Sequence, residues 1–334
     1  MAQVASPSRD LSRRLIAHPG VATPETAMIP RILTRLLWSL VTLAGTAVVT
    51  FLLMNLVPGD VARVIAGAKA TPEVLREIHR KLHLDEPMPV RLSIHLRQLA
   101  QGDLGYSYVT EQPVAEAIAN RAPVTAMVGL MAIVLWMGLA IPIGVFTATR
   151  RGTLPDRAVL VAATLTLSLP AFWLARMAQY WLSYRWGLFP VAGFRGVVHL
   201  ALPALTLAIL AAGYYSRLIH TSMVEVLDQP FIRTARAKGL PEPVVLLRYG
   251  LRNAMIPVVT VLGMDVAFLL GGVVFVENVF ALPGIGTLAV QSVFNLDVAM
   301  ILGVVLFSGA CVVGTNLLVD LLYKWIDPRV KPTH

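Results

Sequence analysis

The stretch TARAKGL, residues 234–240, lies in a basic loop between two long apolar runs. Its residues predict a short helix that ends at Gly239, because glycine adopts the left-handed conformation found just beyond helix ends. Pro241 and Pro243 prevent that helix from continuing. The next residues, VVLLRYGLRNAMIP (244–257), predict a second helix that leads into an apolar run. The loop is therefore predicted to be a helix, a glycine break and another helix.

The side chains of this loop suggest a contact with another protein surface. Ala235, Ala237 and Gly239 are small enough to allow a close approach, and neighbouring Arg and Lys side chains would surround the contact. The alternative is that these basic residues serve only membrane topology and the helix dipole.

Composition places the chain in a membrane. The mean hydropathy is +0.70, and 56% of the 334 residues are hydrophobic whereas 14% are charged. This exceeds what a water-soluble domain normally carries. The formal charge of +9 is scattered between apolar runs, so we expect lipid contact and no nucleic-acid partner. A single cysteine, Cys311, excludes an internal disulfide framework.

Six apolar runs are long enough to span a hydrocarbon core, which takes about 20 helical residues. They are residues 36–57, 124–148, 158–182, 200–215, 255–276 and 300–322. Backbone polar groups in lipid must be paired internally, and the runs lack the alternation of a membrane barrel. The predicted fold is an all-α integral membrane protein with six transmembrane helices.

The distribution of Lys and Arg predicts which side each connection faces. Connections on one side of the six runs, including both ends of the chain, hold 17 of these residues. On the other side, the short connections hold two, and segment 58–123 balances eight bases with eight acids. Both termini and the loop 216–254 are therefore predicted to be cytoplasmic. We predict a disordered cytoplasmic tail at residues 1–30, a first transmembrane helix at 31–57, and a cytoplasmic tail at 323–334.

Segment 58–123 is predicted to be an external amphipathic cap that lies against the helices. Residues 71–84 predict a helix with Thr71 as its cap and Pro72 at its first position. A second helix, VRLSIHLRQLA (90–100), should end at the turn GDLG (102–105). Three histidines occur in this segment, and we interpret them as solvated surface rather than as a metal site. These histidines are His79, His83 and His95.

Signatures of catalysis or nucleotide binding do not occur in the sequence. It has no G-x-x-x-x-G-K-[ST], H-E-x-x-H, G-x-S-x-G or C-x-x-C pattern. Ionisable residues within the apolar runs are few, and the clearest is Asp265. A carboxylate at that depth could line a polar translocation path, or it could form a hydrogen bond between helices. We therefore expect no catalytic residue and no bound metal in this chain.

The loop and several other segments resemble a known family. FIRTARAKGL (231–240), followed by LRNAMIPVVTVLG (251–263), resembles the coupling loop of ABC-importer permeases in the version carried by dipeptide and oligopeptide importers. Seven further segments resemble the B-type subunit of that family in the same order. They are LVPGD (56–60), GDLGYS (102–107), RRG followed by D (150–156), LSLPAFWLA (167–175), HLALPALTLA (199–208), LLGGVVFVENVFALPGIG (269–286) and NLLVDLLYKWIDPRV (316–330).

The resemblance can be followed residue by residue in the loop. The general family pattern is E-A-A, three residues, then G. Thr234 and Ala235 take the alanine places, Gly239 takes the glycine place, and Arg233 stands where the pattern has Glu. These departures are typical of the peptide-importer branch. The resemblance thus implies an ATPase-coupling site at Arg233, Thr234, Ala235, Arg236, Ala237, Lys238 and Gly239.

What the resemblance implies is a type I ABC importer in the bacterial inner membrane. Residues 124–322 would be the core permease domain. The partners would be a second, C-type permease subunit, two ABC ATPase subunits and an extracytoplasmic solute-binding protein. This chain would bind no cofactor, because ATP and Mg would be held by the ATPases. An external gate loop would include Phe280, Pro283, Gly284 and Gly286, although these residues could instead form a re-entrant turn that packs the helices.

The resemblance implies peptide import, with other readings left open. Related permeases serve nickel, glutathione or other small solutes, and selectivity rests largely in the binding protein. An ion-coupled secondary transporter is disfavoured because the sequence has few intramembrane charges and no internal inverted repeat. A membrane enzyme is disfavoured by the missing catalytic groups.

Overall fold

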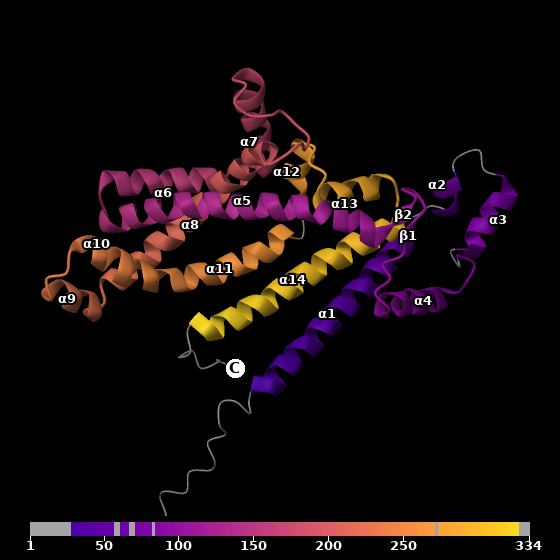
Figure 1. The fold of residues 1–334 in the computed structure, drawn as a ribbon, viewed down its shortest axis with the longest axis horizontal. Coiled ribbons are helices and arrows are strands. Elements are labelled where there is room, and N and C mark those ends of the chain that lie inside the picture. The colour runs from indigo at the N-terminus through magenta and orange to yellow at the C-terminus, as the bar shows by residue number, and fades with distance from the viewer. Residues whose placement is uncertain (1–27, 57–60, 67–70, 82–83, 271–272, 327–334) are drawn as a thin grey trace, which may run out of the picture. The chain divides into compact units, whose positions relative to one another are not determined.

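The computed structural model describes residues 28–56, 61–66, 71–81, 84–270 and 273–326, and most of them are helical (Figure 1). Residue contacts divide the chain after Thr42. The described part of the first unit is the beginning of α1 (Met28–Leu56), where Trp38 and Leu40 are each 67% exposed. Such an apolar exposed helix face requires lipid or a partner to cover it. Most of the predicted N-terminal tail lies outside the described residues.

Within the described residues, five helical segments are long and apolar enough to cross a membrane. They are Thr34–Leu56, Val114–Thr149, Val198–Leu227, Glu242–Val266 and Val298–Leu318. A bent pair of helices brings the number to as many as six. The prediction of an all-α membrane fold is confirmed, apart from one hairpin of two-residue strands.

The third apolar run, predicted as one continuous helix over 158–182, is broken. α6 (Leu154–Leu167) ends before Pro170, and α7 (Ala171–Ala178) continues as the π-helical segment η1 (Gln179–Arg185). The two parts meet at an angle of 100°, and Figure 1 shows α7 turned away from α6. Proline lacks an N–H and pushes the residue before it out of the helical region. The prediction of a single straight helix was therefore wrong.

The other helices differ from their predicted runs mainly in length. α5 (Val114–Thr149) and α8 (Val198–Leu227) each extend well beyond the apolar run that predicted them. α11 (Arg252–Leu270) ends earlier, and the chain then forms two short helices, α12 (Val274–Val279) and α13 (Ile285–Phe294). The last helix is α14 (Val298–Ile326).

Segment 58–123 contains more structure than the sequence predicted. α3 (Pro72–Lys81) and α4 (Met88–Ala100) match the two predicted helices. α2 (Val61–Ala66) and the antiparallel strands β1 (Tyr106–Ser107) and β2 (Gln112–Pro113) were not predicted. The residues from Val114 onward already belong to α5.

Local contacts in this segment confirm the predicted helix cap and the predicted turn. The N–H of Val74 donates to Thr71 Oγ1 at 3.5 Å, as expected of a helix cap. In the GDLG turn, Gly105 N donates to Asp103 Oδ1 at 2.8 Å. His79 contacts Asp85, and His83 lies outside the described residues. His95 is half-buried and stacks on Phe51 of α1, so the interpretation as solvated surface was wrong for His95.

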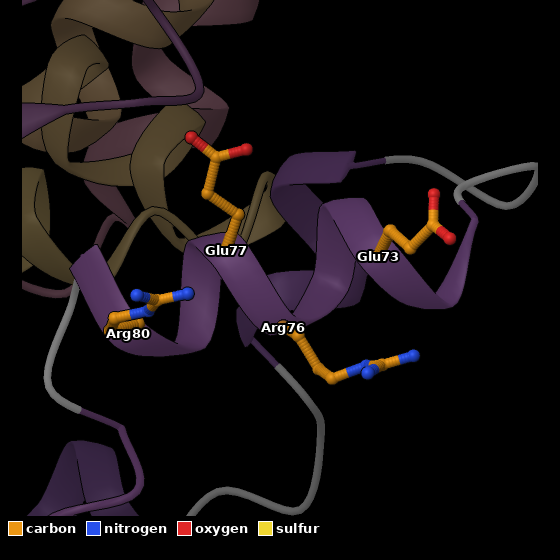
Figure 2. Close-up of a pocket in the computed structure, with 4 residues that line it drawn as sticks. All are labelled: Glu73, Arg76, Glu77 and Arg80. Carbon is orange, nitrogen blue, oxygen red and sulfur yellow. The ribbon is translucent and has the colours of Figure 1, made fainter.

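A pocket of about 610 Å³ lies on α3 and is lined by Glu73, Arg76, Glu77 and Arg80. All four side chains come from this one helix, and they point in different directions rather than toward a common centre (Figure 2). Ligand sites usually combine apolar walls with a few convergent polar groups. We therefore interpret this pocket as the charged surface of an amphipathic helix.

Small residues allow α5 and α8 to pack closely. Ala140, Gly144 and Ala148 recur every fourth residue on α5, and a similar row on α8 consists of Ala204, Ala208 and Ala212. A Cβ added at Gly144 would lie 2.7 Å from Ile219 Cβ and 2.8 Å from the carbonyl oxygen of Ser216. Close approach through small residues is typical of helix pairs in membranes.

Candidate functional site

The loop between α8 and α11 has the predicted form of helix, break and helix. α9 (Pro230–Ala237) begins with proline at its first position and is followed by Lys238 and then Gly239, whose φ is +75°. Gly239 N donates to the carbonyl oxygen of Arg236 at 2.9 Å, which closes the end of the helix. The chain then continues through α10 (Glu242–Val244) and the π-helical segment η2 (Val245–Leu251) into α11. We call residues 228–251 the α8–α11 loop.

The α8–α11 loop has a small apolar core of its own. Ile232, Ala235 and Val245 are buried together, with Leu240 and Tyr249 packed around them. Ala235 is only 5% exposed. The sequence had suggested Ala235 as a point of close approach for another surface, but the structure directs this side chain into the loop itself. Its role in the loop is therefore to let α9 pack on η2.

The outer face of α9 carries the remaining predicted residues. Arg233, Thr234, Ala237 and Lys238 are exposed, and beside them Phe231 is 42% exposed. The sequence reasoning did not include Phe231, although an aromatic residue at the start of a polar helix could have indicated it. This face therefore combines basic groups with an exposed aromatic ring.

Arg236 differs from the other bases because it is held within the loop. Its guanidinium forms two hydrogen bonds to the Glu242 carboxylate, at 2.8 and 3.2 Å, and these raise the pKa of Arg236. Both side chains are about half exposed, so the pair contributes roughly 0.2–1 kcal/mol. Among the described residues, Arg233 and Lys238 form no such pair. On α9 and its end, Arg233 and Lys238 are thus available to an outside partner.

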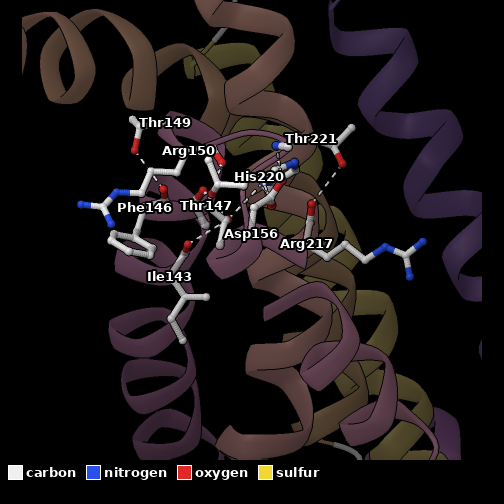
Figure 3. Close-up of polar contacts among 12 residues, drawn as sticks. Ile143, Phe146, Thr147, Thr149, Arg150, Asp156, Arg217, His220 and Thr221 are labelled. Carbon is white, nitrogen blue, oxygen red and sulfur yellow. Dashed lines mark hydrogen bonds and ion pairs between the residues drawn. The ribbon is translucent and has the colours of Figure 1, made fainter. Parts of the chain in front are cut away.

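Polar contacts link α8 to the turn between α5 and α6 just before the loop begins. His220 Nδ1 lies 3.1 Å from Thr147 Oγ1 and 3.5 Å from Asp156 Oδ1. Asp156 is buried, and its Oδ2 accepts the N–H of Gly152 at 2.8 Å. Figure 3 shows these groups converging while the side chain of Arg217 points away. The α8–α11 loop therefore follows a part of α8 that is held to α5 and α6 by polar contacts.

Asp265 forms a hydrogen bond between helices. Its Oδ2 accepts the hydroxyl of Tyr215, on α8, at 2.7 Å. Tyr215 is fully buried and stacks on Trp136 of α5, with 5.6 Å between the ring centroids. Arg176, another ionisable residue within the apolar runs, donates to Gln179 at 2.9 Å. Lining of a translocation path by Asp265 stays a prediction.

The predicted gate residues lie in a hairpin formed by α12, α13 and their connection, residues 273–294, which we call the α12–α13 hairpin. Phe280 is 2% exposed and packs with Leu200 and Val276, whereas Pro283 is exposed. Gly284 and Gly286 are buried. The sequence reasoning missed Glu277, which is fully buried beside both glycines. A lone acid in an otherwise apolar run could have indicated it.

A second pocket, of about 540 Å³, is lined by residues of α1, α4, the β-hairpin and the start of α14. Phe51, His95, Tyr106 and Asp297 contribute to its wall. It contains none of the predicted site residues. Within the described residues no group of three or more His, Cys, Asp or Glu side chains is arranged to hold a metal ion.

Comparison with known proteins agrees with these features. The family model "Binding-protein-dependent transport system inner membrane component" matches residues 140–332. The model "Binding-prot-dependent transport system membrane comp, N-term" matches residues 28–129. Together these matches cover most of the described helices.

Individual relatives match nearly the whole chain. A protein of Brucella abortus (strain 2308), provisionally named a peptide transport system permease protein, is 41% identical over 312 residues, covering 91% of this chain and 99% of the relative. The glutathione transport system permease protein GsiC of Salmonella typhi is 39% identical over 304 residues, with the same coverage of both chains. The chain belongs to the family of inner membrane components of binding-protein-dependent transport systems: it is a multi-pass ABC-importer permease of the bacterial inner membrane, and not an enzyme.

Proposed function

We propose that this chain forms half of the translocation pathway of a peptide importer and is driven by ATPases that bind the α8–α11 loop. The observation that carries the proposal is the exposed surface of α9 and its end, where Phe231 and the bases Arg233 and Lys238 all face outward. Interfaces favour an aromatic anchor surrounded by polar groups. The buried contacts of Ile232 and Ala235 would hold this face in one orientation.

Movement of the loop would be transmitted to the membrane helices through α8. The α8–α11 loop packs on the end of α8, since Met223 and Leu227 lie against Gly250 of η2. Farther back, His220 contacts the end of α5, and Ile219 lies against Gly144. These contacts support a lever in which α9, α8 and α5 move together.

The proposed orientation places both termini and the α8–α11 loop in the cytoplasm, because the excess of Lys and Arg lies on that side. The α12–α13 hairpin would then lie at the external side, where exposed Pro283 could meet a solute-binding protein. ATP and Mg would be bound by two partner ATPases, with none bound by this chain. A second, C-type permease subunit would complete the pathway, with Asp265 contributing a polar group to it.

Peptides are the proposed solute class because a relative at 41% identity carries a peptide-transport name. Glutathione is the second candidate, since a relative at 39% identity is named for it. Nickel or another small solute is the remaining alternative. Binding measurements on the cognate solute-binding protein would separate these, and a protein that bound nickel but no peptide would overturn the peptide proposal.

The coupling proposal is tested in the complete transporter reconstituted in proteoliposomes. The double variant Arg233→Glu with Lys238→Glu reverses the two exposed bases of α9 and its end that lie outside the Arg236–Glu242 pair. We expect it to reduce co-purification of the ATPases and ATP-driven uptake by at least tenfold. An ATPase surface that accepts two bases would then face two acids, and such a mismatch costs on the order of 1.4 kcal/mol or more.

The matched control reverses two exposed bases on α3, Arg76→Glu with Arg80→Glu, which lie far from the α8–α11 loop in sequence (Figure 2). We expect this control to retain ATPase association and uptake. Equal behaviour of the two double variants would contradict a specific role for α9.

A further inference from the structure

Glu277 is a buried carboxylate with a defined set of partners. Its side chain, in the first turn of the short helix α12, is fully buried. Oε1 accepts the hydroxyl of Thr125, on α5, at 2.6 Å, and Oε2 accepts the N–H of Thr287, in α13, at 3.0 Å. A buried carboxylate is costly unless such donors satisfy it. Glu277 therefore joins α12 and α13 to α5, which is distant from both of them in sequence.

The backbone around Glu277 leaves no room for side chains at two positions. A Cβ on Gly284 would lie 2.3 Å from the Glu277 carboxyl carbon. A Cβ on Gly286 would lie 2.9 Å from Glu277 Oε2 and 2.7 Å from Val274 Cα. The two glycines of the sequence PGIG thus allow the connection to pass directly over the carboxylate. This close approach fixes both the acid and the hairpin.

Thr125 completes the link from the side of α5. Its Oγ1 donates to Glu277 and at the same time accepts the N–H of Ile285 at 2.8 Å. One turn earlier on α5, Arg121 donates to Gln291 of α13 at 3.1 Å and is attracted electrostatically by Glu277. The α12–α13 hairpin is therefore attached to one face of α5 at two points.

Near its C-terminal end, α5 contacts α8. Thr147 near the end of α5 meets His220, and Thr125 near its beginning meets Glu277. The two threonines are 22 positions apart, which corresponds to about 33 Å at 1.5 Å per helical residue. This distance matches the thickness of a hydrocarbon core. α5 thus connects a contact near the α8–α11 loop to a contact in the α12–α13 hairpin.

We propose that Glu277 is a positioning residue that makes the α12–α13 hairpin move with α5, so that displacement of the α8–α11 loop reaches the opposite end of the protein. Glu277 binds no solute in this account. It holds Thr125 and the start of α13 in one rigid group. The proposal rests on the proposed function, because it requires that ATPases drive the α8–α11 loop.

The test uses the complete transporter in proteoliposomes and measures solute molecules imported per ATP hydrolysed. Glu277→Gln keeps the size of the side chain but removes one acceptor, and Thr125→Val keeps the shape but removes the hydroxyl. We expect both variants to retain ATPase association and ATP hydrolysis, and to lower the import ratio by about tenfold, the effect of losing a charge-assisted hydrogen bond. Thr125→Ser keeps the hydroxyl and should restore most of the ratio.

A cross-link provides an independent measurement that does not require Glu277 to be changed. Arg121→Cys and Gln291→Cys, in a Cys311→Ala background, can be joined by a short bifunctional reagent. We expect the cross-linked transporter to import solute normally, and the same cross-link to restore the import ratio of Thr125→Val. Loss of import on cross-linking would overturn the proposal, since it would show that α5 and the hairpin must separate.

The outcomes also distinguish this inference from the proposed function. A normal import ratio in Glu277→Gln and Thr125→Val would overturn the role of Glu277 alone. An equal fall in import and ATP hydrolysis would also overturn it, because a general structural defect would then explain the result. The charge reversal on α9 tests the proposed function separately, because its result does not depend on Glu277 or Thr125.

Discussion

Single glycines determine how closely the helices of this permease approach one another. Gly144 brings α5 against Ile219 of α8, whereas Gly138, on the same helix, has open space where a Cβ would lie. The sequence does not show which of the two glycines is needed for close packing, whereas the contacts in the structure do. Gly239 is a third case, because its surroundings are open and its φ of +75° is the constraint.

A substitution of Gly144 should therefore destabilise the protein. In Gly144→Ala the new methyl group would contact Ile219 Cβ and the Ser216 carbonyl, and the helices would have to move apart. We expect the free energy of unfolding to fall by about 1–3 kcal/mol, as in other overpacked cores. Gly138→Ala is the control, and should be neutral or gain up to about 1 kcal/mol from helix propensity. Denaturant unfolding in detergent measures both, and equal effects would contradict the close packing of α5 and α8.

At the scale of elements, the predictable features were those encoded by neighbouring residues. The break in the α8–α11 loop could be predicted because Gly239, Pro241 and Pro243 act locally. The break between α6 and α7 could have been predicted in the same way from Pro170, although the run 158–182 is long and apolar enough to predict one helix. Local backbone chemistry overrides hydropathy at that point.

The parts that could not be predicted depend on residues distant in sequence. Ala235 faces inward because Val245, on the far side of the glycine break, provides the surface it packs against. The hydrogen bond between Thr125 and Glu277 joins positions 152 residues apart. One sequence contains no information on such a pairing, because each residue alone fits many environments.

At Gly239, between α9 and α10, substitutions should be tolerated according to how readily the new residue adopts the left-handed backbone conformation. Gly239→Ala places a Cβ in the left-handed region at a cost of about 1–2 kcal/mol, whereas asparagine visits this region more readily. We expect ATP-driven uptake and amide-exchange protection of α9 to fall in Gly239→Ala and to be better retained in Gly239→Asn. Since no atom crowds this position, a larger defect in Gly239→Asn would show that space rather than backbone conformation is limiting.

Across the molecule, α5 links the α8–α11 loop to the α12–α13 hairpin. The α8–α11 loop presents Phe231, Arg233 and Lys238 at one end, and α5 reaches from the contact of His220 to that of Glu277. Composition and apolar runs alone predicted the membrane class and most of the spans. The direction of coupling is a proposal that follows from the contacts of the loop and from the excess of Lys and Arg on its side.

The most direct measurement of the central claim is site-specific cross-linking in the complete transporter. Replacing Cys311 by alanine gives a chain without cysteine. A new cysteine is then introduced on the exposed face of α9 as Ala237→Cys, or on α3 as Arg80→Cys for the control. The account predicts that Ala237→Cys forms a cross-link to an ATPase subunit whose yield changes with ATP, and that Arg80→Cys forms none. A cross-link to the ATPase from Arg80→Cys, with none from Ala237→Cys, would contradict the account.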